Sequence, residues 1–332
     1  MRKPLAWTDY NIHDLVRLRT NLSPIAVPPY FRVNGTDPNF ELALVDRVET
    51  PREGEAKRVV GYTAYDLGGG EVVYEAEVPI MVLLGLKSRW RFRLQGLGAD
   101  RTRIETSAPF LGFQPVRFKV VQLLSRLALL VLTTKLLAKG YGMCHATSVA
   151  ADGRAHLLFG YSGTGKSSLA GILLDRGYEF LSDDYAIVDA GGIVYCYPDW
   201  HRPREVRPSQ LSRYVYQPKR YVRPDLKIRA QARVDTVYIL ERGPDRIEHL
   251  DPDEAIRRIL LLNMEELSKL WNSPITVMLN HYAYFYPELD FAKLMDAYRA
   301  TVLSFLGRAE RFVGVRSSSP RFEALQGRLE RS

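Results

Sequence analysis

One stretch of this sequence combines residue types that suit the binding of a phosphate chain. Residues 160–167 read Gly-Tyr-Ser-Gly-Thr-Gly-Lys-Ser, which fits the pattern G-x-x-x-x-G-K-[ST]. The glycines let the backbone aim several N–H groups at one anion. Lys166 adds a positive charge for the outer phosphates, and the Ser167 hydroxyl is a hard oxygen ligand that suits Mg²⁺. The residues expected to contact a nucleotide are Gly160, Ser162, Gly163, Thr164, Gly165, Lys166, Ser167 and Ser168.

The segments on either side of this loop have the patterns of a strand and a helix. Residues 156–159 form a short apolar run, which predicts a strand that enters the loop. Leu169, Ile172 and Leu173 have helical spacing, and Gly177 is a typical helix stop. Such a helix points its positive N-terminal end at the same anion. This order of elements is the context in which the motif binds phosphate.

Two adjacent carboxylates, Asp183 and Asp184, end the next predicted strand, and a histidine precedes the loop. One carboxylate beside the phosphates can hold Mg²⁺, and the other can accept a proton from an attacking hydroxyl. Neighbouring side chains on an extended segment point in different directions, so we expect them to divide these roles. His145, on a strand predicted over 143–150, could orient Asp183, touch the metal shell or contact the γ-phosphate. The alternatives are a solvated aspartate turn and a hydrogen-bonded core histidine.

The composition is that of a globular protein with a hydrophobic core. The 332 residues, 46% of them apolar and 25% charged, allow one large domain or two of ordinary size. The formal net charge of +8 is compatible with ATP, an acidic peptide or nucleic acid, and does not choose among them. Cys144 and Cys196 make neither a disulfide framework nor a zinc site, so we expect a reducing cytoplasm. The N-terminus lacks the apolar run of a signal peptide.

Two domains are predicted, with a boundary near residue 112. Residues 1–112 form a β-rich N-terminal domain, which we interpret as a substrate-docking module or a lid. Residues 113–332 form an α/β catalytic domain with a helical C-terminal part. The apolar segment 113–139 is predicted as a buried helix, since charges interrupt it and its uncharged runs are too short to span a bilayer. A membrane-surface helix is the alternative. The N-terminal strands are predicted at 40–45, 58–65, 71–78 and 90–94.

The order of His145, the glycine-rich loop, the Asp-Arg-Gly that closes the helix, and Asp183-Asp184 resembles the catalytic domain of HPr kinase/phosphorylase. The resemblance covers roughly residues 143 to 190. That family is an ATP-dependent serine protein kinase whose fold is related to phosphoenolpyruvate carboxykinase. The resemblance therefore implies an α/β fold with a phosphate-loop kinase core, and Mg²⁺ and ATP as cofactors. The N-terminal region does not look like the N-terminal domain of that kinase.

The resemblance also implies roles for individual residues. Lys166 and Ser167 would hold the phosphates and Mg²⁺, Asp184 would be the metal-side carboxylate, and Asp183 would be the base toward the substrate hydroxyl. His145 would support the site.

A shorter similarity lies at Glu205-Val206-Arg207, which resembles the Glu-Ile-Arg of a later family signature. There Glu205 would help to bind metal and Arg207 would contact phosphate. Pro208 stands where the family has glycine. The surrounding segment 199–233, rich in Arg, Lys and Pro, is predicted as a long loop that either closes over phosphates or is solvated.

The leading hypothesis is a Mg·ATP-dependent phosphotransferase that acts on a serine hydroxyl of a protein or peptide. Divergent relatives of the HPr kinase phosphorylate precursor peptides in natural-product pathways, and this chain is more similar to them. Two alternatives stay open: a nucleotide-dependent switch without transfer, and a kinase of a small-molecule hydroxyl. Neither a nucleic-acid nor a membrane partner is expected. The HPr kinase is a hexamer, so the resemblance allows a homo-oligomer.

Overall fold

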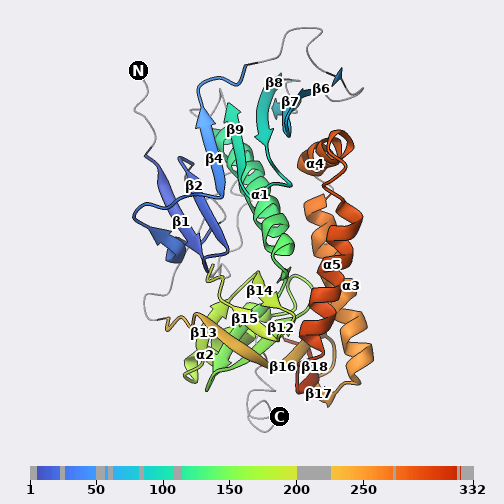
Figure 1. Ribbon diagram of the computed structural model, residues 1–332. Helices are drawn as coiled ribbons and strands as arrows, with labels where there is room; N and C mark the ends of the chain where they lie inside the picture. The colour runs from blue at the N-terminus through green and yellow to red at the C-terminus, as the bar shows by residue number, and fades with distance from the viewer. Residues whose placement is uncertain are drawn as a thin grey trace. The chain divides into compact units, whose positions relative to one another are not determined.

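A computed structural model describes residues 6–22, 27–49, 57–58, 63–81, 86–107, 114–199, 226–271, 274–319 and 322. These residues form a mixed α/β protein with two large sheets, as predicted (Figure 1). The chain divides into two compact units. The first unit contains residues 1–135, 208–217 and 270–292, and the second contains residues 136–207, 218–269 and 293–332.

The sheet of the first unit has the strand order β3-β1-β2-β4-β9-β8-β7-β6-β5. Neighbouring strands are antiparallel except for the parallel pairs β2–β4 and β4–β9. Leu42, Ile104, Leu94 and Val72 stand in register across four strands and are fully buried, which is how alternating sequences build one dry face. The strands are β1 (Thr8–Ile12), β2 (Val16–Thr20), β3 (Arg32–Val33), β4 (Phe40–Val45), β5 (Lys57–Arg58), β6 (Thr63–Gly68), β7 (Glu71–Met81), β8 (Leu86–Gln95) and β9 (Thr102–Ser107), with the short helix η1 (Pro29–Phe31).

Three of the four predicted N-terminal strands lie within observed strands, namely β4, β7 and β8. The strand predicted over 58–65 is divided between β5 and β6, and residues 59–62 lie outside the described residues. Strands β1, β2 and β9 were missed by the sequence reading. Strand β2 alternates apolar residues with arginines, whereas β1 and β9 consist mainly of polar residues. Each of the three covers only five or six positions, so its apolar pattern is short.

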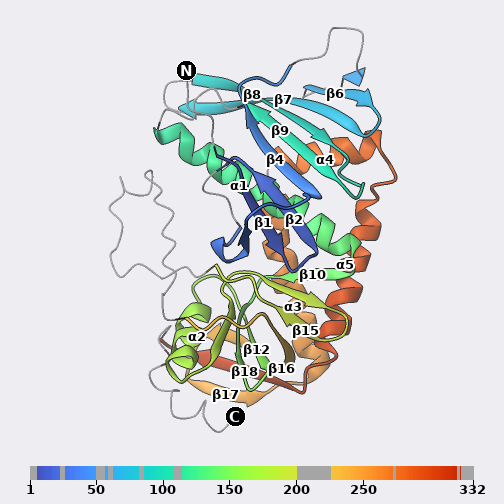
Figure 2. The same cartoon turned by 60° about the vertical axis from the view of Figure 1, so that its left-hand side comes forward.

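Helix α1 (Gln114–Ala138) lies along this sheet (Figures 1 and 2). Leu127, Val131 and Leu136 are fully buried, which confirms the interpretation as a buried helix. Lys135 is also buried, and its Nζ donates to the main-chain oxygen of Asp100 at 2.8 Å. None of the helices in the described part of the chain is long and apolar enough to cross a bilayer.

Helix α4 (Pro274–Phe285), which the sequence did not predict, is tied to the same sheet. The Tyr282 hydroxyl donates to the Gly70 carbonyl at 2.9 Å and accepts from the Leu97 N–H at 3.2 Å. These bonds join the helix to the turn between β6 and β7 and to the end of β8.

The sheet of the second unit has the order β10-β14-β15-β16-β12-β11-β13, and β18 pairs with both β16 and β17. The pairs β12–β16 and β16–β18 are parallel. The carboxyl ends of these three strands therefore meet at one edge of the sheet. The strands are β10 (Tyr141–Cys144), β11 (Thr147–Ala151), β12 (Arg154–Phe159), β13 (Glu179–Ser182), β14 (Ala186–Asp189), β15 (Ile193–Tyr195), β16 (Gln231–Arg242), β17 (Arg246–His249) and β18 (Arg311–Ser317).

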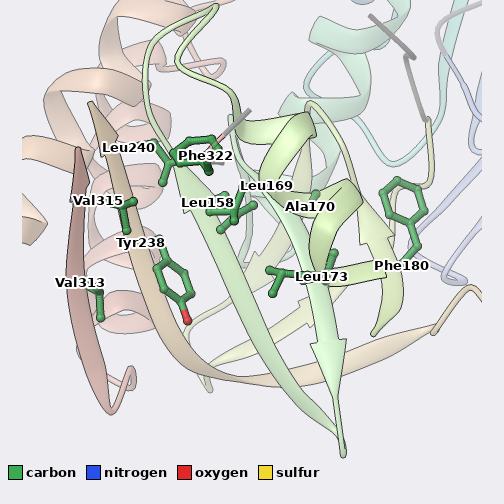
Figure 3. Close-up of a cluster of buried hydrophobic side chains, with 11 residues drawn as sticks. Leu158, Leu169, Ala170, Leu173, Phe180, Tyr238, Leu240, Val313, Val315 and Phe322 are labelled. Atoms are coloured by element: carbon green, nitrogen blue, oxygen red, sulfur yellow. The ribbon is translucent and has the colours of Figure 1, made fainter. Parts of the chain in front are cut away.

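Helix α2 (Lys166–Asp175) packs against this sheet. Leu169 and Leu173 on the helix meet Leu158, Phe180 and residues of β16 and β18 in one buried cluster (Figure 3). Burial of such side chains contributes roughly 1.5–3 kcal/mol each, so this cluster fixes the helix on the sheet. The predicted stop is confirmed, because Gly177 has a φ of +91° and closes the last turn.

The sequence also predicts a hairpin turn at Asp152-Gly153 and a helix over 253–262 with Asp251 or Asp253 as its cap, and the turn and the cap are confirmed. Asp152 and Gly153 have φ of +49° and +79° and connect the antiparallel strands β11 and β12. Asp251 caps the helix that follows it by accepting the Glu254 N–H at 3.0 Å. That helix, α3, extends beyond the range expected from sequence. The remaining helices are α3 (Pro252–Trp271) and α5 (Phe291–Leu306).

Candidate functional site

The glycine-rich loop joins the carboxyl end of β12 to the first residue of α2. Gly160 has a φ of +154°, and a Cβ at this position would lie 2.7 Å from both the Leu240 oxygen and the Thr164 hydroxyl. Gly165 caps the helix with a φ of +104°. Side chains are therefore excluded at Gly160 by close packing and disfavoured at Gly165 by conformation. The loop has the shape that brings backbone N–H groups to an anion at a helix N-terminus.

Lys166 is buried, and its ammonium group lies against the loop itself. Its Nζ donates to the Gly160 carbonyl at 2.6 Å and to the Tyr161 carbonyl at 3.3 Å. The Thr164 hydroxyl donates to the same Tyr161 carbonyl at 2.8 Å. The loop thus keeps a buried cation between strand and helix. An arriving phosphate can compete for this cation, since a charged acceptor is stronger than a carbonyl.

Ser167, the next residue of the loop motif, contacts the first of the two aspartates. Its Oγ donates to Asp183 Oδ1 at 2.7 Å. Asp183 follows β13, which reaches the loop because β13 pairs with β11 and β11 pairs with β12. Its residue exposure is only 1%, so this carboxylate is held inside the protein.

Thr147, at the start of β11, also contacts Asp183. Its hydroxyl donates to the Asp183 main-chain carbonyl at 2.5 Å and lies 3.3 Å from Oδ1. Next to it, the hydroxyls of Ser148 and Ser182 are 2.6 Å apart. All of these serine and threonine side chains are fully buried, apart from the half-buried Ser167. This hydroxyl network fixes the bend that carries the carboxylate.

Asp184 and His145 lie farther out than Asp183, and both are half-buried. The His145 ring meets the ring of Tyr185, the neighbour of Asp184, edge to face with centroids 5.9 Å apart. The main-chain N–H of His145 donates to Asn263 Oδ1 on α3 at 2.7 Å.

The strand predicted over 143–150 is wrong at His145, because residues 145–146 lie between β10 and β11 and belong to neither strand. Cys144 still pairs with β14, whereas Thr147 already pairs with β12. The backbone changes partner within two residues, and Ala146 N–H donates to the Cys144 carbonyl at 3.0 Å in this turn. His145 therefore lies in the turn between two strands and not within a hydrogen-bonded strand pair.

The other predicted site residues fall into two groups. Ser162 and Gly163 are exposed at the tip of the loop, and Ser168 is half-buried in the first turn of α2. Glu205 and Arg207, together with most of the basic segment, lie outside the described residues. Within the described ranges, no three His, Cys, Asp or Glu side chains come together as a metal cluster.

The donor set that is present fits Mg²⁺ better than a softer metal. The Ser167 hydroxyl and the Asp183 carboxylate are hard oxygen ligands in contact with each other. Mg²⁺ is commonly held by one or two protein oxygens plus phosphates and water, so a larger protein cage is not required. The buried Lys166, whose ammonium group lies beside the loop, supplies the cation that phosphates require.

Two residues of the site were missed by the sequence reading, Thr147 and Asn263. Thr147 had a weak signal, because it is a polar residue in a strand that is otherwise built of small buried residues. Asn263 had none, since it lies in a helix 118 residues away from His145 along the chain.

Comparisons with known proteins add little to this geometry. A scan against protein-family models found no match, and a search of curated proteins found no similar sequence. Among solved structures, the HPr(Ser) kinase/phosphatase from Coxiella burnetii is similar over 32% of this chain and 72% of its own, at 18% sequence identity and a TM-score of 0.22. At this TM-score the likeness carries no inference about fold or activity, which therefore rest on the residues of this chain.

Proposed function

We propose that this protein is a Mg·ATP-dependent phosphotransferase that acts on a hydroxyl group, and that its acceptor is a serine of a protein or peptide. The observation that supports this most is the contact between Ser167 and the buried Asp183. In phosphate-loop enzymes the serine or threonine after the lysine and an aspartate at a strand end hold Mg²⁺ together. The choice of a serine acceptor rests on the sequence resemblance to HPr kinase/phosphorylase.

The chain's own groups supply positioning and charge, which are the main requirements of phosphoryl transfer. Backbone N–H groups of the loop and of the α2 N-terminus bind the phosphates. The Lys166 ammonium exchanges the carbonyls of Gly160 and Tyr161 for phosphate oxygens and balances their charge. Mg·ATP, when bound, supplies the phosphoryl group and a divalent charge beside it.

The geometry favours an exchange of the roles that the resemblance gave to the two aspartates. Asp183 is 1% exposed and bonded to Ser167, so we assign it to the metal side. Asp184 is half-buried and therefore more accessible to an acceptor hydroxyl, so we assign it as the base. His145, packed on the Tyr185 ring, supports the segment that carries Asp184.

The test is transfer from γ-labelled ATP with Mg²⁺ to proteins and peptides encoded by neighbouring genes, resolved by mass spectrometry. A phosphoserine on one of these candidates is expected. Asp184→Asn should keep Mg·ATP affinity within about threefold and lower transfer by about 10²-fold or more, as expected for loss of a general base. Asp183→Asn should weaken the Mg²⁺-dependent part of ATP binding as well.

Three other outcomes would change this proposal. If Asp183→Asn keeps Mg·ATP affinity and loses only transfer, the roles implied by the resemblance are correct and our exchange is wrong. Tight ATP binding without transfer to any protein or peptide would replace the phosphotransferase with a nucleotide-dependent switch. Transfer to a metabolite in a cell extract, but to no protein, would make it a small-molecule kinase.

A further inference from the structure

A buried asparagine on α3 contacts the backbone beside the candidate site. Asn263 is 2% exposed, and its Oδ1 accepts the His145 N–H at 2.7 Å. Its Nδ2 donates to the Ile259 carbonyl, one turn earlier in the same helix, at 2.9 Å. Both polar atoms of the amide are therefore hydrogen-bonded. One bond lies within the helix, and the other joins the helix to the turn between β10 and β11.

The two partners leave only one orientation for this amide. A backbone N–H can only donate, so it must face the amide oxygen, and a carbonyl can only accept, so it must face the NH₂ group. The helix thus fixes the Asn263 side chain, and the side chain in turn fixes His145 N. An apolar residue at this position would leave the half-buried His145 N–H without this partner.

The segment held in this way connects to both candidate aspartates. His145 packs its ring on Tyr185, which follows Asp184. Thr147, two residues later, holds Asp183 through its hydroxyl. A small displacement at His145 N would therefore move both groups that orient the acid pair. Misplacement of a site by about 1 Å can lower a rate by about 10²-fold.

We propose that Asn263 is a positioning residue of the phosphotransfer site, and that it acts through the backbone of His145. The inference rests on the proposed function for its catalytic consequence, but the contact itself can be tested without any substrate. The inference adds helix α3 to the candidate site. The sequence resemblance covers roughly residues 143 to 190 and does not include that helix.

The experiment compares Asn263→Ala and Asn263→Asp with the unaltered full-length chain. Amide hydrogen exchange is followed at His145, and Mg·ATP affinity, kcat and KM of transfer are measured on the same samples. Asn263→Ala should raise exchange at His145 by about tenfold or more and lower kcat by about 10- to 100-fold, with Mg·ATP affinity within about threefold. Asn263→Asp keeps an acceptor for the His145 N–H but sets its second carboxylate oxygen against the Ile259 carbonyl, so it should restore the protection at His145 and kcat only in part.

Tyr298→Phe is the matched control. Tyr298 is also buried and belongs to helix α5, and its hydroxyl donates to the Met143 carbonyl at 3.3 Å, on the same strand β10. This variant loses a helix-to-strand bond of the same kind, two residues before His145. It should lower the unfolding midpoint slightly and leave exchange at His145 and kcat unchanged.

Two results would overturn the inference. The first is unchanged exchange at His145 in Asn263→Ala. The second is full transfer activity in Asn263→Ala, or a loss no larger than that in Tyr298→Phe. A lack of any transfer by the unaltered protein is a different failure, since it removes the proposed function while the exchange data still decide whether Asn263 holds His145.

Discussion

Strand β12 has a buried aspartate near each of its ends, and the two are held in different ways. At the carboxyl end, the contacts of Asp183 include the hydroxyls of Ser167 and Thr147. Near the amino end, Asp235 of β16 forms ion pairs with Arg154 at 2.8 Å and with a second arginine at 3.1 Å. That second arginine is on β18, so the cluster joins the three parallel strands.

The two clusters differ in how charge is balanced. Burial raises the pKa of Asp235, but bonds from Thr236, Arg154 and Arg311 outweigh it and lower the pKa to about 2. Arginines of the same chain thus balance the charge of Asp235, as a buried ion pair requires. Asp183 instead lies at the end of the strand beside the glycine-rich loop and accepts a hydrogen bond from the Ser167 hydroxyl. We therefore expect substitutions near Asp183 to affect nucleotide binding and transfer, and substitutions near Asp235 to affect stability.

Lys166→Ala should have the largest effect and should act on function alone. Removal of the buried ammonium takes away the point charge for the phosphates, so nucleotide binding or transfer should fall by about 10²- to 10³-fold. The measurement is ATP binding by calorimetry together with labelled transfer. Lys227→Ala is the control, because Lys227 is 77% exposed at its side chain and forms an ion pair with Glu179. Full activity of Lys166→Ala would contradict the assignment of this loop as a phosphate site.

Asp235→Asn should reduce stability and leave nucleotide binding unchanged. The lowered pKa corresponds to about 2 kcal/mol of stability at neutral pH, and denaturant unfolding measures its loss. A folded-state pKa below the unfolded value gives stability that is present above about pH 4 and is lost as the pH falls toward 2. The difference between the two proteins should therefore shrink from about pH 5 downward.

The control for that experiment is Glu310→Gln. Glu310 lies 3.5 Å from Arg154 but is 65% exposed at its side chain, so its removal should cost less than about 0.5 kcal/mol. A loss of ATP affinity in Asp235→Asn, or a difference that does not depend on pH, would mean that the two ends of β12 are not independent.

His156→Phe should have the smallest effect of these substitutions. His156 lies on β12 itself, the strand that connects the two aspartate clusters. His156 is buried against the rings of Tyr178 and Tyr238, and its Nδ1 has no hydrogen-bond partner among the described residues. Burial lowers its pKa, the nearby Asp235 opposes this, and Arg311 adds to it. A ring of similar size should change stability at neutral pH by less than about 1.5 kcal/mol.

The pH dependence gives the sharper readout for this variant. Because the folded-state pKa of His156 is lowered, the unfolded chain takes up the proton first, and stability is lost as the pH falls below about 6.5. His156→Phe should lose less stability than the unaltered protein between about pH 7 and 5 in urea unfolding. Parallel curves for the two proteins would show that His156 contributes nothing to the acid response.

The sequence predicted the elements whose signals are local. The loop between β12 and α2, the stop at Gly177 and the turn at Asp152-Gly153 are each set by a few adjacent residues, and all were located correctly. Glycine conformations and helix caps depend on neighbours within about five residues. The mixed α/β class followed from the same local signals.

The tertiary structure decided which of these groups meet. The sequence pattern contains no reason why Ser167 should bond Asp183 rather than Asp184, or why the strand should be interrupted at His145. It also gave no signal for Asn263, which reaches His145 only after the sheet and α3 have packed. Contacts of this kind depend on strand pairing and on the burial of side chains from distant segments. Short-range patterns carry no information about them, because one residue change in register or packing would present different polar groups to the same loop.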